Sequence, residues 1–137
     1  MFNTSPVYNI DVVALDQYRF IISYIDSSTV RPYLLLCHRT DESVVIDGDP
    51  VLLSNNKVVS TRIIKYDSNK LLISYTKLGT KYLEICSVSV VDDELVSDFY
   101  ESVTLDLETY SDLLVFNNDY YMFVSNDAYY DLWKISL

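Results

Sequence analysis

The chain has 137 residues, half of them hydrophobic and 14% aromatic, which is enough for one buried core and excludes an intrinsically disordered protein. Its 20 acidic and 10 basic side chains give a net charge of −10 at pH 7. Because this charge repels a phosphate backbone and no run of basic residues offsets it, nucleic acid is excluded as a partner.

Short apolar runs predict β-strands along the whole chain. They are rich in Val, Ile, Leu, Tyr and Thr and end at clusters of Asn, Asp and Ser, whereas helical periodicity fits poorly. In chain order, we expect strands at 7–15, 18–26, 32–39 and 43–53, then at 57–66, 69–76, 81–91 and 94–105, and then at 109–117, 119–126 and 129–137. The runs RFIISYI (19–25) and KLLISYT (70–76) are almost continuously apolar, which predicts inner strands covered on both faces.

One five-residue word recurs at a fixed interval. It reads FIISY at 20–24, LLISY at 71–75 and MFVSN at 122–126, so each copy begins 51 residues after the one before. A fixed period of this size indicates a repeat architecture, in which each copy is one supersecondary unit that stacks on its neighbours to bury its faces.

A second match follows the first. YLLLC, YLEIC and YYDLW correspond in the three copies, which puts Cys37, Cys86 and Trp133 in equivalent positions. We therefore expect the two cysteines to point the same way in neighbouring repeats. They would then be too far apart for a disulfide and would be buried free thiols.

Four antiparallel strands in each unit of about 50 residues is the pattern of a β-propeller blade. In this pattern the chain resembles β-propeller repeat proteins over almost its whole length, but it lacks a GH and WD pair and paired glycines, so it matches no particular propeller family. The resemblance implies an all-β fold of antiparallel, four-stranded blade-like repeats: a partial β-propeller in a single domain. The domain spans 1–137, with repeats at about 7–56, 57–108 and 109–137. A β-sandwich with an internal duplication is the alternative.

We expect the third repeat to lack a fourth strand, which would leave an open sheet edge. Natural proteins pair or cover such edges. We expect a second copy of the chain to close it, giving a six-bladed ring with two-fold symmetry. The alternatives are coverage by residues 1–6 of the same chain or by a different protein.

No catalytic, cofactor-binding or metal-binding motif is recognisable. His38 is the only histidine and follows Cys37 directly, so the two side chains point to opposite faces of a strand and cannot form a Cys/His dyad. The acidic segments IDGDP (46–50) and VDDEL (91–95) carry the oxygen ligands that a cation such as calcium uses. Neither matches a known calcium loop, so turn formation is the favoured interpretation. We expect no cofactor, no bound metal and no enzymatic activity.

Tyrosines in or beside predicted turns form the candidate interaction surface, because a Tyr ring offers a large, stiff contact area with a polar tip. They are Tyr100, Tyr110, Tyr120, Tyr121, Tyr129 and Tyr130. The alternative is that these residues are ordinary strand tyrosines.

These features predict a non-enzymatic structural or protein-interaction module that uses blade edges and Tyr-rich loops for self-association or a larger assembly. A phage or viral virion component would suit the size and composition. The alternative is a small oligomeric glycan-binding propeller, similar to lectins assembled from short chains, although the equivalent positions Arg39, Val88 and Ile135 repeat no polar residue.

The start MFNTSPVYNI lacks a signal-peptide pattern, and no apolar run reaches the roughly 20 residues that span a bilayer. We therefore expect a cytoplasmic or virion-associated protein that is not secreted by a signal peptide and does not bind membranes.

Overall fold

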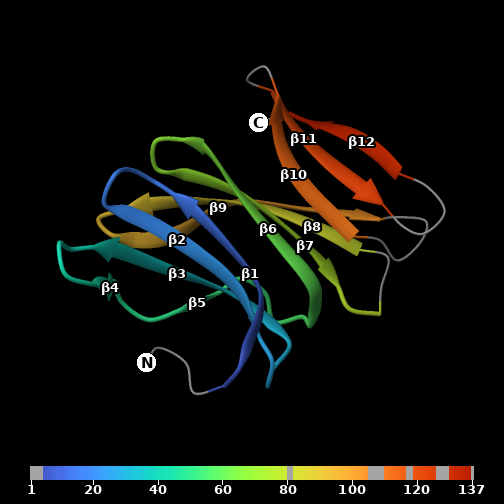
Figure 1. The fold of residues 1–137 in the computed structure, drawn as a ribbon. Helices are drawn as coiled ribbons and strands as arrows, with labels where there is room; N and C mark the ends of the chain where they lie inside the picture. Colours follow the sequence, from blue (N-terminus) through green and yellow to red (C-terminus); the bar gives the residue numbers. More distant parts are fainter. Residues whose placement is uncertain (1–4, 80–81, 105–109, 117–118, 126–129, 137) are drawn as a thin grey trace.

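The computed structural model describes residues 5–79, 82–104, 110–116, 119–125 and 130–136, and within them the chain forms β-strands joined by turns (Figure 1). The strands make three antiparallel sheets, which we name A, B and C in chain order. The expected all-β, antiparallel fold is confirmed. None of the described segments is a helix long and apolar enough to cross a membrane.

Sheet A is formed by the first repeat. Its strands are β1 (Val7–Ala14), β2 (Arg19–Asp26), β3 (Arg31–Arg39), β4 (Val44–Ile46) and β5 (Val51–Leu52). β2 lies between β1 and β3, and both β4 and β5 pair with β3. The prediction of one strand over 43–53 was wrong. Gly48, with a φ of 79°, turns the chain, and Pro50 has no N–H to donate to a ladder, so two short strands form instead.

Sheets B and C are formed by the second and third repeats, and in both the strands lie side by side in sequence order. Sheet B contains β6 (Val58–Asp67), β7 (Lys70–Lys77), β8 (Tyr82–Val91) and β9 (Glu94–Thr104). Sheet C contains β10 (Tyr110–Phe116), β11 (Asp119–Ser125) and β12 (Tyr130–Ile135). β7 begins and ends 51 residues after β2, so the interval of the repeated word is also the interval between equivalent strands.

Each sheet has two faces, because successive side chains of a strand point to opposite sides. We call the face that carries Ile22 in sheet A, Ile73 in sheet B and Trp133 in sheet C the front face, and the other the back face. The pairs Ile22 with Leu35, Ile73 with Cys86, and Met122 with Trp133 lie opposite one another across neighbouring strands and fix these assignments.

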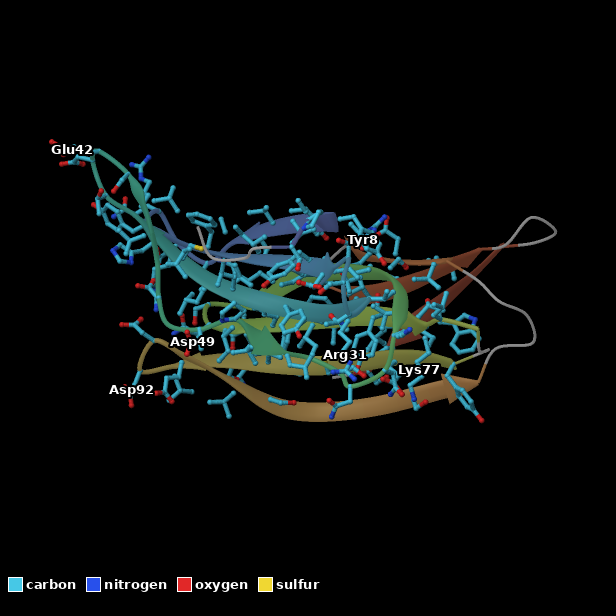
Figure 2. The ribbon with its side chains drawn as sticks, turned by 90° about the horizontal axis from the view of Figure 1, so that it is seen from below. Tyr8, Arg31, Glu42, Asp49, Lys77 and Asp92 are labelled. Atoms are coloured by element: carbon cyan, nitrogen blue, oxygen red, sulfur yellow. The ribbon has the colours of Figure 1, made fainter. Side chains whose placement is uncertain are left out.

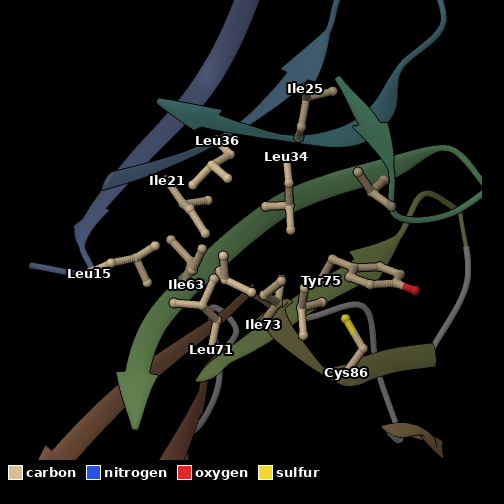
Figure 3. Close-up of a cluster of buried hydrophobic side chains, with 13 residues drawn as sticks. Leu15, Ile21, Ile25, Leu34, Leu36, Ile63, Leu71, Ile73, Tyr75 and Cys86 are labelled. Carbon is tan, nitrogen blue, oxygen red and sulfur yellow. The ribbon is translucent and has the colours of Figure 1, made fainter. Parts of the chain in front are cut away.

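The main core lies between the back face of sheet A and the front face of sheet B (Figure 3). Ile21, Leu34 and Leu36 of sheet A point toward Leu71 and Ile73 of sheet B, and all five are buried. The alternation of each strand brings the apolar side chains to this layer, and their burial supplies the main stabilisation of the two sheets.

A second core lies between the back face of sheet B and the front face of sheet C. Leu72, Leu83 and Ile85 of sheet B are buried there with Leu113, and the half-buried Trp133 packs against them. The same arrangement thus occurs twice: the back face of one sheet covers the front face of the next.

The first strands of sheets A and B, β1 and β6, lie next to each other and are joined by side chains instead of a backbone ladder (Figure 1). Asn9 interrupts the regular pairing of β1 with β2 and has a φ of 50°. Its Oδ1 accepts a hydrogen bond of 2.6 Å from the backbone N–H of Thr61, and Asp11 Oδ2 accepts one of 3.2 Å from the N–H of Ile63. Two donors at the free edge of β6 are therefore satisfied by side chains of β1.

Replacing Asn9 with alanine is expected to destabilise the fold by about 1–3 kcal/mol, because the Thr61 N–H loses its acceptor and alanine tolerates a positive φ poorly. Chemical denaturation followed by circular dichroism measures the change. The matched control is Asn56→Ala, since Asn56 is exposed in the turn before β6 and bonds only within that turn. An Asn9→Ala variant as stable as Asn56→Ala would show that this bridge contributes nothing.

Candidate interaction surface

The front face of sheet A is an apolar surface that neither of the other two sheets covers. Tyr24, Leu35 and Cys37 are buried at its centre, and Phe20, Ile22, Tyr33 and Ile46 pack around them while remaining partly exposed. Ile10, Val12 and Val44 are each more than half exposed at its rim. The exposed part of this face is its rim on β1 and β4, and this rim surrounds a centre that is already buried in the single chain. We call this surface the outer face of sheet A.

The sequence places these residues by simple alternation along β2 and β3. Phe20, Ile22 and Tyr24 are two residues apart in β2, and they lie opposite Cys37, Leu35 and Tyr33 of β3. Because apolar residues occupy both alternating sets of β2 positions, the strand supplies the outer face with the same kind of side chain that its back face contributes to the core.

The prediction that RFIISYI and KLLISYT are covered on both faces is confirmed for β7 and only in part for β2. In β7, residues 71–76 are all buried between sheets A and C. In β2, Ile21 and Ile25 are buried against sheet B, but Phe20 and Ile22 on the outer face are only half-buried. The two strands share a sequence pattern and differ in what covers their front faces.

Tyr24 at the centre of the outer face stacks on Tyr33 beside it. Their rings are nearly parallel, with centroids 5.7 Å apart and an angle of 16° between the planes. Burial raises the pKa of Tyr24 to about 12, and the nearby Asp26 carboxylate adds to the rise. The phenol therefore stays neutral throughout the physiological range, and the centre of the outer face carries no charge from this ring.

Both cysteines are buried free thiols, as predicted. The alignment of the second match needs a correction, however. Cys37 lies opposite Phe20 and Trp133 lies opposite Met122, whereas Cys86 lies opposite Ile73, so Val88 is the true counterpart of Cys37 in sheet B. The match was out by two residues, which keeps each side chain on the front face because the strand period is two.

Both thiols are expected to be unreactive in the folded protein. Burial raises the pKa of Cys86 to about 12, and burial also raises that of Cys37, with the Asp47 carboxylate adding to the effect. At pH 8 we expect Ellman's reagent to modify the native protein at least about tenfold more slowly than the chain unfolded in guanidinium. Equal rates in the two states would show that the layers holding these cysteines open readily.

The two acidic segments come together at one end of the molecule (Figure 2). They line a pocket of about 240 Å³ between sheets A and B, with residues Leu36, Asp47, Gly48, Asp49, Val51, Asp93, Glu94 and Leu95. Within the described part of the chain, no three His, Cys, Asp or Glu side chains are placed to hold a metal ion. Asp92 and Asp93, with φ of 49° and 60°, form the two-residue turn between β8 and β9, as the turn interpretation predicted.

His38 lies beside this pocket and is half-buried. Its Nδ1 is 2.8 Å from Oδ1 and 2.9 Å from Oδ2 of Asp47. His38 lies opposite Arg19 and Cys37 lies opposite Phe20, so the histidine and the thiol are on opposite faces of β3, as predicted.

Near the pocket, Arg19 forms ion pairs with Asp16 and Asp93 at 2.8 Å and 3.3 Å. The Asp16 carboxylate accepts hydrogen bonds from the backbone N–H of Arg19, the backbone N–H of Tyr18 and the guanidinium of Arg19, and these lower the pKa of Asp16 to about 2.

Most of the predicted tyrosine surface lies in strands. Tyr100 is inside β9 opposite Cys86, Tyr110 and Tyr130 are the first residues of β10 and β12 and both lie opposite Ser125, and Tyr129 falls outside the described residues. Tyr120 and Tyr121 are half-buried in β11.

Tyr120 makes an intramolecular contact with sheet B. Its hydroxyl donates a hydrogen bond of 2.8 Å to the backbone carbonyl of Tyr66, and the two rings meet edge to face with centroids 5.7 Å apart. Tyr121 is 3.4 Å from Asp119 through its hydroxyl. The role of the six tyrosines in binding stays a prediction.

Sequence reasoning missed the outer face of sheet A as a candidate site. The repeated word could have indicated it. The apolar run in β2 resembles the one in β7, which is buried on both faces, but in the described chain no sheet precedes sheet A to cover its front face. Comparison of the chain with models of protein families, with curated proteins and with solved structures finds no match.

Proposed function

We propose that the protein is a non-enzymatic structural module that binds other protein chains through the exposed faces of its blade-like sheets. The observation that carries the proposal is the outer face of sheet A, an apolar surface with a fully buried aromatic and aliphatic centre and a partly exposed rim. The exposed apolar side chains of the rim, Ile10, Val12 and Val44, are the part of this face that a partner chain would bury.

The order of the sheets supports a propeller-like arrangement as the finer description of the fold. Each repeat is an up-and-down sheet, the three sheets follow one another in chain order, and the back face of each sheet covers the front face of the next. The first strands β1 and β6 are neighbours, as are β6 and β10. Blades of a propeller are related to one another in this way around an axis.

The same observations favour binding over catalysis. The only histidine is held by Asp47, and the described thiols are buried with raised pKa values, which leaves them poor nucleophiles. Among the described residues that line the acidic pocket, there are carboxylates and no Ser, Thr, Cys or Lys side chain that could act as a nucleophile.

A photo-crosslinking amino acid tests the proposal when it is placed at Val12 on the rim of the outer face. In the cells or particles that contain the protein, we expect a protein adduct of defined mass at Val12. The control is the same amino acid at Leu78, which is 51% exposed compared with 56% for Val12 but lies in the turn after β7. Equal, nonspecific labelling at the two positions would contradict the proposal.

A further inference from the structure

We infer that the outer face of sheet A binds the back face of sheet C from a second copy of this chain. The inference rests on the proposed function, since it names the partner of the same surface. It starts from the packing of the sheets inside one chain, where the front faces of sheets B and C are each covered by the sheet before.

The outer face of sheet A has the residue pattern of a covered front face. Across the 51-residue interval, Ile22 corresponds to Ile73, which is fully buried, and Phe20 corresponds to Leu71, also fully buried. Tyr24 corresponds to Tyr75, whose pKa is raised mainly by burial, with the nearby Glu84 carboxylate adding to the rise. The residues on the outer face of sheet A are therefore of the type that sheet B buries.

The molecule also shows what kind of surface covers a front face. The front face of sheet B is covered by the back face of sheet A, and the front face of sheet C by the back face of sheet B. In the described residues, the back face of sheet C is the one back face with no sheet packed on it. The same contact made between two chains would place that back face on the outer face of sheet A.

The back face of sheet C offers an apolar residue for this contact. Trp133 and Ile135 of β12 point toward sheet B, so the alternate residues Leu132 and Lys134 lie on the back face, and Leu132 is 52% exposed. Lys134 forms an ion pair of 2.8 Å with Asp119, which balances its charge beside Leu132. Burial of Leu132 in a dimer would remove this exposed apolar side chain from water.

The contact joins two different surfaces, so it is heterologous. Two chains that make it twice would close into a ring of six sheets, the arrangement expected for a propeller built from two chains. A contact between two outer faces of sheet A would instead be isologous, and it would leave the back face of sheet C unused. Variants on the two faces separate these arrangements.

Sedimentation velocity on Val12→Lys, on Leu132→Lys and on their equimolar mixture tests the inference. Both sites are about half exposed, so the folded chain accommodates either lysine, which circular dichroism verifies. For the wild type we expect a dimer, and for each variant a dissociation constant raised at least about tenfold, because a lysine at an apolar contact loses its hydration. The control Leu78→Lys should associate like the wild type.

The mixture decides between the arrangements. A Leu132→Lys chain keeps its outer face and a Val12→Lys chain keeps its sheet C, so together they form one intact contact and should associate more tightly than either variant alone. An isologous contact would make Leu132→Lys indistinguishable from the wild type and would overturn the inference. A wild type that is monomeric at every concentration would overturn it as well. If the Val12 crosslink then captures a different protein, the proposed function stands without this inference, and if it captures nothing, both fail.

Discussion

Replacing Ile73 with alanine is expected to lower the free energy of unfolding by about 2–5 kcal/mol, the range for a large apolar side chain removed from a packed core. Ile73 is fully buried between sheets A and B in the centre of the largest core (Figure 3). The same replacement at Ile22 is expected to cost only about 1–2 kcal/mol in the isolated chain, because Ile22 has a similar sequence environment but is only half-buried. Equilibrium unfolding in urea, followed by fluorescence of Trp133, measures both changes.

The repeat makes Ile22 a matched control for Ile73. At low protein concentration the two variants should differ in stability, and the difference should shrink at high concentration, where a second copy covers Ile22. Equal losses at low concentration would mean that the chain buries the outer face of sheet A by itself. If the two variants differ in stability by the same amount at every protein concentration, a second copy does not cover the outer face of sheet A.

Replacing Lys77 with methionine is expected to destabilise the protein by about 3–5 kcal/mol, the range for leaving one partner of a buried ion pair alone. The Lys77 ammonium lies against the carboxylate of Glu84, which is completely buried in β8 next to Tyr75. Methionine has nearly the same length as lysine without its charge, so the variant keeps the packing of the aliphatic stem and leaves the buried carboxylate without its cation. Thermal and urea unfolding at pH 7 measure the loss.

The double variant Lys77→Met/Glu84→Gln is the control for this pair. It removes both charges, and we expect it to be less destabilised than Lys77→Met alone, because no buried charge is left without a partner. Lys77→Arg, which keeps the positive charge, should stay within about 1 kcal/mol of the wild type. A Lys77→Met variant as stable as the wild type would show that the Glu84 carboxylate finds another partner or reaches water.

Much of this fold could be predicted from its sequence because similar sequence segments recur along the chain and form equivalent strands. The word FIISY and its copies place Ile22, Ile73 and Val124 at an equal interval, and period-two alternation then fixes which side chains share a face. The strand boundaries follow from the Asn, Asp and Ser clusters between the runs. Asp16 shows the mechanism, since its Oδ1 accepts hydrogen bonds from the N–H groups of Tyr18 and Arg19 and closes the turn between β1 and β2.

The wrong predictions concern backbone conformation, strand register and the packing of one sheet on another, none of which the apolar pattern specifies. The break between β4 and β5 arises from a positive φ at Gly48, which the apolar pattern of 43–53 hides. The alignment of Cys37 with Cys86 was wrong by two residues. A shift of two keeps a side chain on the same face of its strand, so the apolar pattern does not reveal the error. The candidate surface was missed because burial of a strand depends on the neighbouring sheets. β2 and β7 share the central Ile-Ser-Tyr and a similar apolar pattern, and their places in the stack make one of them partly exposed.

The solution mass of the purified chain over a range of protein concentrations tests the central claim, that the outer face of sheet A is an assembly surface for a second copy, most directly. Light scattering should give a mass that rises from 15.9 kDa toward twice that value as the concentration increases. A mass that stays at 15.9 kDa over the whole range would contradict the claim.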